Sequence, residues 1–260
     1  MIQPACILFL LTLPWSQSLS DPYINCSYGA KRINIKEVPW LASVRSENRH
    51  ICIGTIINTN SILITSTCLT ERNKTSVRTH DLATVTVRVG IRDRDSGTGV
   101  KVCNVIHHPK DSTYPQDNRL ALLKLCKPLI FSAEAREIAI VDKQPQKDAK
   151  VSISGWGSLT RWRFPYLNCG ELLWQVDDHL IDVKACAAER IEHFKLAKSD
   201  RTICLAKKGT ICSYDNGAPL VIEGKLAAIL YFGSCSNKPD VYVSLFSYRD
   251  WIETNSKDKK

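Results

Sequence analysis

Near its C-terminal end, the 260-residue chain reads Cys212-Ser213-Tyr214-Asp215-Asn216-Gly217-Ala218-Pro219. Two short apolar runs follow this stretch, residues 219–222 and 225–231, with a glycine between them. Short apolar runs punctuated by Asn, Gly and Pro are typical of β-strands that are joined in hairpins. The stretch therefore predicts β-structure for this end of the chain.

The same pattern of short, β-branched apolar runs extends toward the N-terminus. The further runs are residues 51–57, 61–65, 84–89, 120–125 and 151–153, with one more at 241–243. Helical periodicity is nearly absent before residues 247–253, where Tyr248, Trp251 and Ile252 predict a closing helix. The pattern favours an all-β fold of two packed β-barrels with a terminal helix, divided near residues 141–150.

The first twenty residues predict export from the cell. Residues 7–13 are apolar except for Thr12, and Ser18-Leu19-Ser20 supplies the small residues that precede a signal peptidase site. We expect cleavage after Ser20. The segment is too short to span a bilayer, and no later segment approaches the roughly 20 apolar residues of a transmembrane helix. The mature chain is therefore expected to be secreted, without a membrane span.

The cysteine count agrees with an extracellular protein. Of the 11 cysteines, Cys6 lies in the signal segment, which leaves an even number for an oxidising compartment. Up to five disulfides are therefore expected. No C-x-x-C pair occurs, and the histidines do not cluster with cysteines at zinc spacing, so we expect no metal site and no cofactor.

Seven motifs occur along the mature chain: Val38-Pro39-Trp40-Leu41-Ala42-Ser43-Val44, His50-Ile51-Cys52-Ile53-Gly54-Thr55-Ile56-Ile57, Ala121-Leu122-Leu123-Lys124-Leu125, Gly155-Trp156-Gly157, the segment 204–219, Pro239-Asp240-Val241-Tyr242 and Trp251-Ile252. In their order and spacing, these motifs make the chain resemble the chymotrypsin/trypsin-like serine proteases of the S1 family. The resemblance implies two packed six-stranded antiparallel β-barrels with a C-terminal helix. The expected division is a signal peptide at 1–20, a short N-terminal segment at 21–32, a trypsin-like domain at 33–254 with barrels at about 33–140 and 141–246, and a polar tail at 255–260.

The family's catalytic triad of histidine, aspartate and serine is replaced at all three positions. Thr67 stands at the histidine position, Arg119 at the aspartate position and Asn216 at the serine position. A threonine hydroxyl does not accept a proton at neutral pH, arginine reverses the charge, and an asparagine amide is not a nucleophile. The resemblance therefore implies a pseudoprotease, a family member without catalysis.

A residual hydrolase with a relocated catalytic site is the alternative. Its residues would be Ser66, His107, His108 or Ser213. Loss of a whole triad removes about 10⁶ in turnover, and a substitute nucleophile and base must lie within roughly 3 Å of each other. His107 and His108 precede a proline in a segment that the family places on an outer loop, so we expect both at the surface.

The substrate pocket is expected to be altered as well. Tyr214 replaces the glycine whose amide helps to build the oxyanion hole, and its side chain is expected to disturb that turn. Thr210 stands at the base of the specificity pocket. Phe232 and Asp240 replace glycines on its walls, so we expect the pocket to be narrowed or filled.

The segment Lys31-Arg32-Ile33 is similar to a protease activation site. However, the family's Val-Gly-Gly does not follow Ile33, and only five residues separate Ile33 from Pro39. We therefore expect no activation by cleavage there. The retained Asp215 is expected to serve packing or loop hydrogen bonds.

The resemblance also implies a set of disulfides. The family pairs are Cys52–Cys68, Cys186–Cys204 and Cys212–Cys235, and we expect Cys103–Cys126 and Cys26–Cys169 among the other four cysteines. Two sequons, at Asn25 and Asn73, predict N-glycosylation in a secreted chain.

The formal net charge of +9 is spread along the chain and accompanies no nucleic-acid-binding module. An exported basic protein is expected to meet anionic proteins, acidic glycans or cell surfaces instead. We expect a non-catalytic homologue that binds extracellular proteins, active serine proteases among them, as an adaptor, cofactor or decoy, for example in an immune cascade or a reproductive secretion. A secreted protein that binds acidic glycans is a second alternative.

Overall fold

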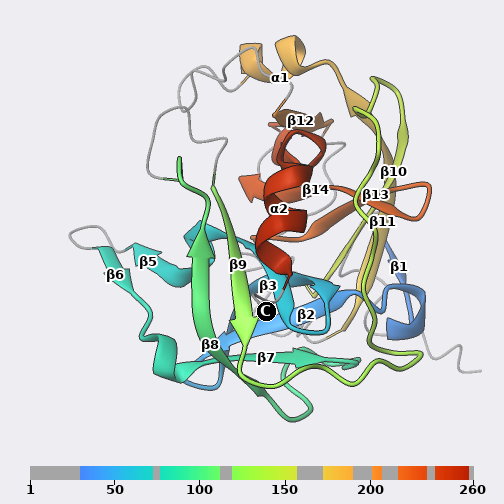
Figure 1. The fold of residues 1–260 in the computed structure, drawn as a ribbon. Coiled ribbons are helices and arrows are strands. Elements are labelled where there is room, and N and C mark those ends of the chain that lie inside the picture. The colour runs from blue at the N-terminus through green and yellow to red at the C-terminus, as the bar shows by residue number, and fades with distance from the viewer. Residues whose placement is uncertain are drawn as a thin grey trace, which may run out of the picture.

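The computed structural model describes residues 30–72, 77–111, 119–156, 172–189, 201–206, 216–232 and 238–257. Two antiparallel β-barrels pack against each other, and a helix at the end of the chain runs from the second toward the first (Figure 1). This arrangement confirms the expected all-β architecture of two six-stranded barrels with a C-terminal helix. None of the helices within the described ranges is long and apolar enough to cross a membrane.

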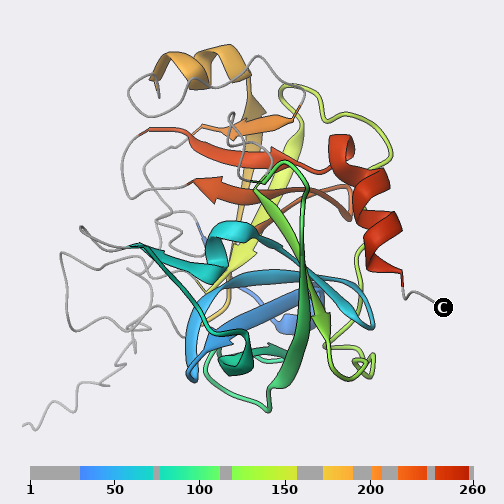
Figure 2. The same cartoon turned by 60° about the vertical axis from the view of Figure 1, so that its left-hand side comes forward.

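The first barrel closes on itself through six strands. In spatial order these are β2 (Leu41–Ser46), β3 (Arg49–Asn58), β4 (Ser61–Thr65), β9 (Leu120–Leu125), β8 (Val100–His107) and β7 (Val85–Val89), which pairs back with β2. A separate hairpin of β5 (Thr70–Arg72) and β6 (Val77–Thr79) projects from this barrel (Figure 2).

The second barrel closes through the pairing of β11 with β12. Its strands, in spatial order, are β11 (Trp174–Ile181), β10 (Lys150–Gly155), β13 (Pro219–Ile222), β14 (Lys225–Phe232), β15 (Asp240–Ser244) and β12 (Thr202–Leu205). The first strand among the described residues, β1 (Lys31–Arg32), adds to the outer edge of β11. A segment that precedes the first barrel in the sequence therefore contributes a strand to the second barrel.

Strand β9 contributes side chains to two hydrophobic clusters, one on each of its faces. Ala121, Leu123 and Leu125 lie in the core of the first barrel, whereas Leu120 and Leu122 pack with residues of the second barrel and the C-terminal helix. Successive side chains of a strand point to opposite faces, so a strand buried on both faces needs a continuous apolar run. The run at 120–125 therefore sits at the junction of the barrels.

The C-terminal helix α2 (Arg249–Ser256) continues a short 3-10 helix, η6 (Phe246–Tyr248). Ile252 is fully buried in the cluster that contains Leu120 and Leu122. The helix expected at residues 247–253 therefore exists, and it extends three residues further. A second short helix, α1 (Val183–Glu189), follows β11 and carries Cys186.

Candidate functional site

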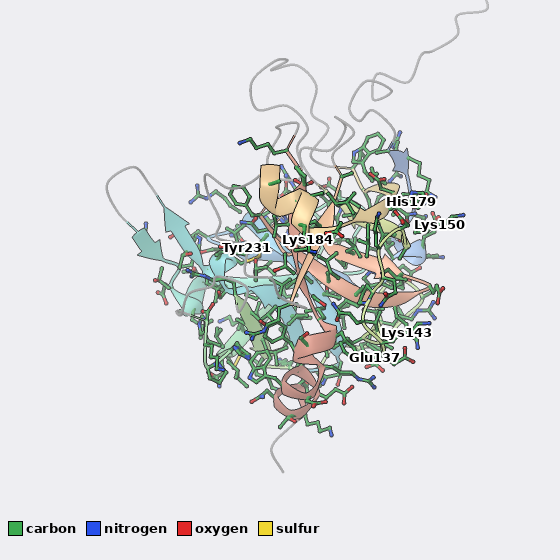
Figure 3. The ribbon with its side chains drawn as sticks, turned by 90° about the horizontal axis from the view of Figure 1, so that it is seen from above. Glu137, Lys143, Lys150, His179, Lys184 and Tyr231 are labelled. Atoms are coloured by element: carbon green, nitrogen blue, oxygen red, sulfur yellow. A yellow bond between two sulfur atoms is a disulfide. The ribbon has the colours of Figure 1, made fainter. Side chains whose placement is uncertain are left out.

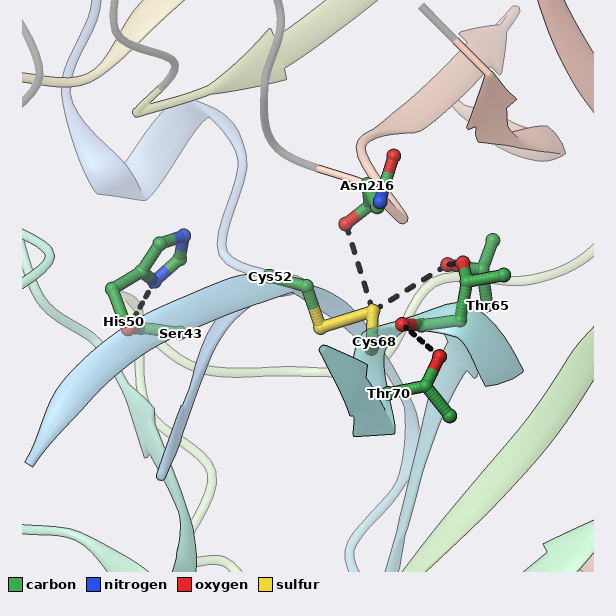
Figure 4. Close-up of a disulfide and its surroundings, with 8 residues drawn as sticks. Ser43, His50, Cys52, Thr65, Cys68, Thr70 and Asn216 are labelled. Atoms are coloured by element: carbon green, nitrogen blue, oxygen red, sulfur yellow. Dashed lines mark hydrogen bonds between the residues drawn. A yellow bond between two sulfur atoms is a disulfide. The ribbon is translucent and has the colours of Figure 1, made fainter. Parts of the chain in front are cut away.

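The position of the family's general base lies on a 3-10 helix, η2 (Ser66–Leu69), directly after β4. The Cys52–Cys68 disulfide ties this helix to β3 (Figure 4). Thr67 is half-buried, and its hydroxyl donates to Oγ1 of Thr65 at 3.2 Å. The Thr67 side chain is thus engaged with its own loop.

Backbone hydrogen bonds link the other two expected triad positions to this region, Arg119 to η2 and Asn216 to β3. The amide of Ser66 donates to the carbonyl oxygen of Arg119 at 3.2 Å. The amide of Ile53 donates to the carbonyl oxygen of Asn216 at 3.0 Å, and this oxygen lies 3.8 Å from Sγ of Cys68. The latter is a contact only, because a disulfide sulfur carries no proton. Thr67 and Asn216 therefore lie beside the Cys52–Cys68 disulfide at the junction of the barrels, and Arg119 is linked through Ser66 to the same 3-10 helix.

Gly217 allows the loop of Asn216 to approach β3 this closely. Its φ is +86°, and a Cβ there would overlap the carbonyl oxygen of Ile53. A left-handed conformation with no room for a side chain requires glycine. The amide of Gly217 donates to the carbonyl oxygen of Leu230 at 2.8 Å, which ties the loop to the second barrel as well.

The candidates for a relocated catalytic site form a different network. The hydroxyl of Ser66 donates to Oδ1 of Asp111, and Oδ2 of Asp111 lies 3.0 Å from Nδ1 of His107. Ser66 is buried and faces the carboxylate rather than the imidazole, whereas His107 is about half exposed. The carboxylate thus lies between the serine and the histidine, so the imidazole does not accept a hydrogen bond from the Ser66 hydroxyl as the base of a triad would.

His108 has a packing role. Its ring makes edge-to-face contacts with the rings of Tyr248 and Trp251, each at a centroid distance of 5.1 Å. The expectation that both histidines lie at the surface is therefore right for His107 and wrong for His108. The half-buried His108 ring helps to seat the C-terminal helix on the first barrel. Ser213, the fourth candidate, lies outside the described residues.

Two of the four specificity-pocket positions are described. Phe232, at the end of β14, packs against the cluster of Cys186, Cys204 and Val241. Asp240, at the start of β15, is buried. Burial, together with the charges of Asp240 and Asp178, raises the pKa of the Tyr242 phenol well above its ordinary value of 10.0. Thr210 and Tyr214 lie outside the described residues.

Within the described residues, three disulfides join Cys52 to Cys68, Cys103 to Cys126 and Cys186 to Cys204. These are three of the five pairs named above. The first fixes η2, the second links β8 to the chain after β9, and the third links α1 to β12. Cys26, Cys169, Cys212, Cys235 and the sequons at Asn25 and Asn73 lie outside the described residues.

The segment similar to an activation site lies in a sheet. Lys31 and Arg32 pair with Gln175 and Trp174 of β11, and the amide of Ile33 donates to the carbonyl oxygen of Leu173 at 3.2 Å. Ile33 also packs against the core of the second barrel. A new N-terminus at Ile33 would require this pairing to break. Among the described residues, no group of three or more His, Cys, Asp or Glu side chains could hold a metal ion.

Comparison with known proteins assigns the chain to a family. The trypsin family model matches residues 27–252, so the chain belongs to the trypsin family. Trypsin iota of Drosophila melanogaster is 29% identical over 84% of this chain and 83% of its own length. Vaa serine proteinase homolog 1 of Vipera ammodytes ammodytes is 25% identical over 95% of this chain and 92% of its own.

A solved structure has the same fold. Neuropsin, a serine protease expressed in the limbic system of mouse brain, superposes with a TM-score of 0.72 over 88% of this chain and 99% of its own. The sequence identity is 22%, so this likeness concerns the fold alone.

The sequence gives no sign that Asp111 lies beside Ser66. Asp111 is 45 residues from Ser66 along the chain, and only the closure of the barrel brings the two together. No spacing or motif in the sequence signals this contact.

Proposed function

We propose that this chain is a secreted member of the trypsin family that lacks peptidase activity and acts by binding other extracellular proteins, as an adaptor, cofactor or decoy. Trypsin-like proteins, to which this chain is related, are generally secreted. The apolar N-terminal segment and the disulfides support the same compartment for this chain.

One observation carries the proposal. The positions expected for the triad hold Thr67, Arg119 and Asn216, which backbone contacts bring to one region near η2, and none of these residues can perform its triad role. Catalysis by the triad needs a base that accepts the serine proton, a carboxylate that orients and stabilises the protonated base, and a nucleophilic hydroxyl. This site offers a neutral hydroxyl, a cation and an amide in their places.

Two further observations support the proposal. Ser66, the described candidate nucleophile, is buried and bonded to Asp111, which argues against a relocated site. The viper relative carries the name serine proteinase homolog. Binding of acidic glycans by this basic chain is the competing function. A search for partners distinguishes protein binding from glycan binding.

The test uses the purified secreted protein beside an active trypsin. We expect no cleavage of a broad peptide library and no labelling by a fluorophosphonate probe, whereas the trypsin does both. Label at a defined serine would contradict the proposal. Co-purification from the native secretion, with and without treatment with glycan-degrading enzymes, is expected to yield a protein partner that survives the treatment.

A further inference from the structure

A pocket of about 350 Å³ opens on the second barrel, and none of its lining residues holds a triad or specificity-pocket position. One wall is the segment 141–149, here called the arch, which joins the first barrel to β10. The other wall is the turn between β13 and β14 at residues 222–225. The sequence alone indicates only a segment of mixed charge at residues 143–150. The proposed absence of peptidase activity does not involve this pocket.

The pocket is built from segments that are fixed at both ends. The arch is held by hydrogen bonds from the Val141 amide to the Leu226 carbonyl and from the Leu180 amide to the Ala149 carbonyl, each 3.0 Å long. The facing turn is a two-residue hairpin loop in which Glu223 and Gly224 have φ of +48° and +74°, values typical of a tight primed turn. Both walls are therefore preformed.

An ion pair joins the two walls. Nζ of Lys225, on the hairpin, lies 2.9 Å from Oδ2 of Asp142, on the arch. The hydrogen bond from Lys225 is the main cause that lowers the pKa of Asp142, so the pair is charged at neutral pH. Because Lys225 and Asp142 neutralise each other, neither is expected to be the main charged contact for a ligand.

The other lining residues form an apolar floor and a charged rim. Val141, Ala149 and Ile222 supply an apolar floor. Lys143 on the arch and Glu223 on the hairpin stand at the exposed rim, and neither joins an ion pair with any residue that the structure describes. Figure 3 places Lys143 on the same side of the molecule as Lys150. The rim therefore presents one cation and one anion on opposite walls of a pocket with an apolar floor, to which the arch also contributes Gln144 and Gln146.

We infer that the pocket receives one apolar side chain of a partner polypeptide, whose flanking residues are an acid that pairs with Lys143 and a base that pairs with Glu223. The inference rests on the proposed function, since it names the kind of partner segment. The volume is at the small end for ligand pockets, which suits a single aromatic or large aliphatic anchor. The exposed rim favours a polypeptide over a free small molecule, because a chain crossing the rim also makes contacts outside the pocket.

The direct test is an NMR titration of the full-length, ¹⁵N-labelled secreted protein. The probes are acetylated, amidated tripeptides with phenylalanine between aspartate and arginine, in both orders, and the matching peptides with glycine in the centre. We expect one phenylalanine peptide to cause saturable shifts of the amides of Gln144, Ala149 and Lys225. Absence of saturable shifts, or equal binding of the glycine peptide, would overturn the inference.

Charge variants make the test specific. Lys143→Gln and Glu223→Gln are each expected to weaken binding of the phenylalanine peptide by about two- to fivefold, the effect of an exposed ion pair. Lys147→Gln is the matched control, since this exposed lysine lies on the arch but does not line the pocket, and it should bind as the wild type does. Wild-type affinity in both rim variants would refute the charged rim.

Failure of this inference can be separated from failure of the proposed function. If the native partner is captured equally by the wild type and by the Lys143→Gln/Glu223→Gln double variant, the pocket is not the interface and the binding role stands. If the protein proves to be a peptidase, the binding role fails whatever the tripeptide titration gives.

Discussion

The ammonium group of Lys124, on β9 of the first barrel, donates to the carbonyl oxygen of Ser256, the last residue of α2, at 2.8 Å. Side chains of Ser61 and Asn58 donate to the same oxygen, each at 2.9 Å. The carbonyl groups at the end of a helix carry partial negative charge and lack partners within the helix. Three donors from the first barrel therefore cap the helix that closes the chain.

Replacing Lys124 with methionine should loosen this cap. The variant retains the apolar stem and loses a charged hydrogen bond, so we expect the free energy of unfolding to fall by about 1.5–3 kcal/mol. Urea unfolding would measure the change. Lys257→Met, at an exposed position one residue beyond the helix, serves as the control. Equal stability of the two variants would show that the cap contributes nothing measurable.

Two glycines with similar backbone angles should respond differently to alanine. Gly217 (φ +86°) has the Ile53 carbonyl in the space that a Cβ would take, whereas Gly224 (φ +74°) has nothing within 4 Å. Gly224→Ala should cost about 1–2 kcal/mol from backbone strain alone. Gly217→Ala should cost about 4 kcal/mol or more, because the barrels must also move apart locally. Similar unfolding midpoints for the two variants would argue against close packing at Gly217.

Asp95 should contribute stability that is lost in acid. Partial burial acts to raise its pKa, but hydrogen bonds and charges from Arg45 and Arg94 outweigh burial and place the pKa below its ordinary value of 3.8. The folded form then binds fewer protons than the unfolded form, so the contribution is present above pH 3.8 and disappears as the pH falls through the folded pKa. Asp95→Asn should be less stable than wild type at pH 7, with a gap that narrows below about pH 4. A gap that is constant between pH 7 and pH 3 in urea unfolding would contradict the ion pair.

Restoring the triad should not restore a good protease. The triple variant Thr67→His, Arg119→Asp and Asn216→Ser retains Phe232 packed near the Cys186–Cys204 disulfide and a buried Asp240. Tyr214 also remains at an oxyanion position, where loss of one donor costs about 10²–10³ in turnover. We expect kcat/KM on trypsin substrates to stay at least about 10²-fold below that of an active trypsin. Trypsin-like turnover would show that these substitutions leave the pocket open.

Three of the predicted runs, 61–65, 120–125 and 219–222, agree with β4, β9 and β13 at both ends. These strands are rich in apolar residues because most of their side chains are buried. Strand β11 was not predicted, because it contains Asp177, Asp178 and His179, which lie on or near the surface. Helix α1 spans only seven residues, too few for a periodic pattern to be recognised.

For the site, the family motifs predict Thr67, Arg119 and Asn216 as the triad positions, and backbone contacts place all three near η2. The contact between Ser66 and Asp111 and the pocket under the arch depend on how separate segments pack. Such relationships leave no local pattern, so only the three-dimensional arrangement reveals them.

The first and last elements that the structure describes, β1 and α2, are fastened to different barrels, and this has a consequence for biosynthesis. While the protein is being made, every strand of the first barrel is available once Leu125 has been synthesised. Strand β1 must wait for Trp174 and Gln175, and Lys124 must wait for Ser256. Both fastenings therefore form late, so we expect the nascent chain to become resistant to proteases only after Ser256 has left the ribosome.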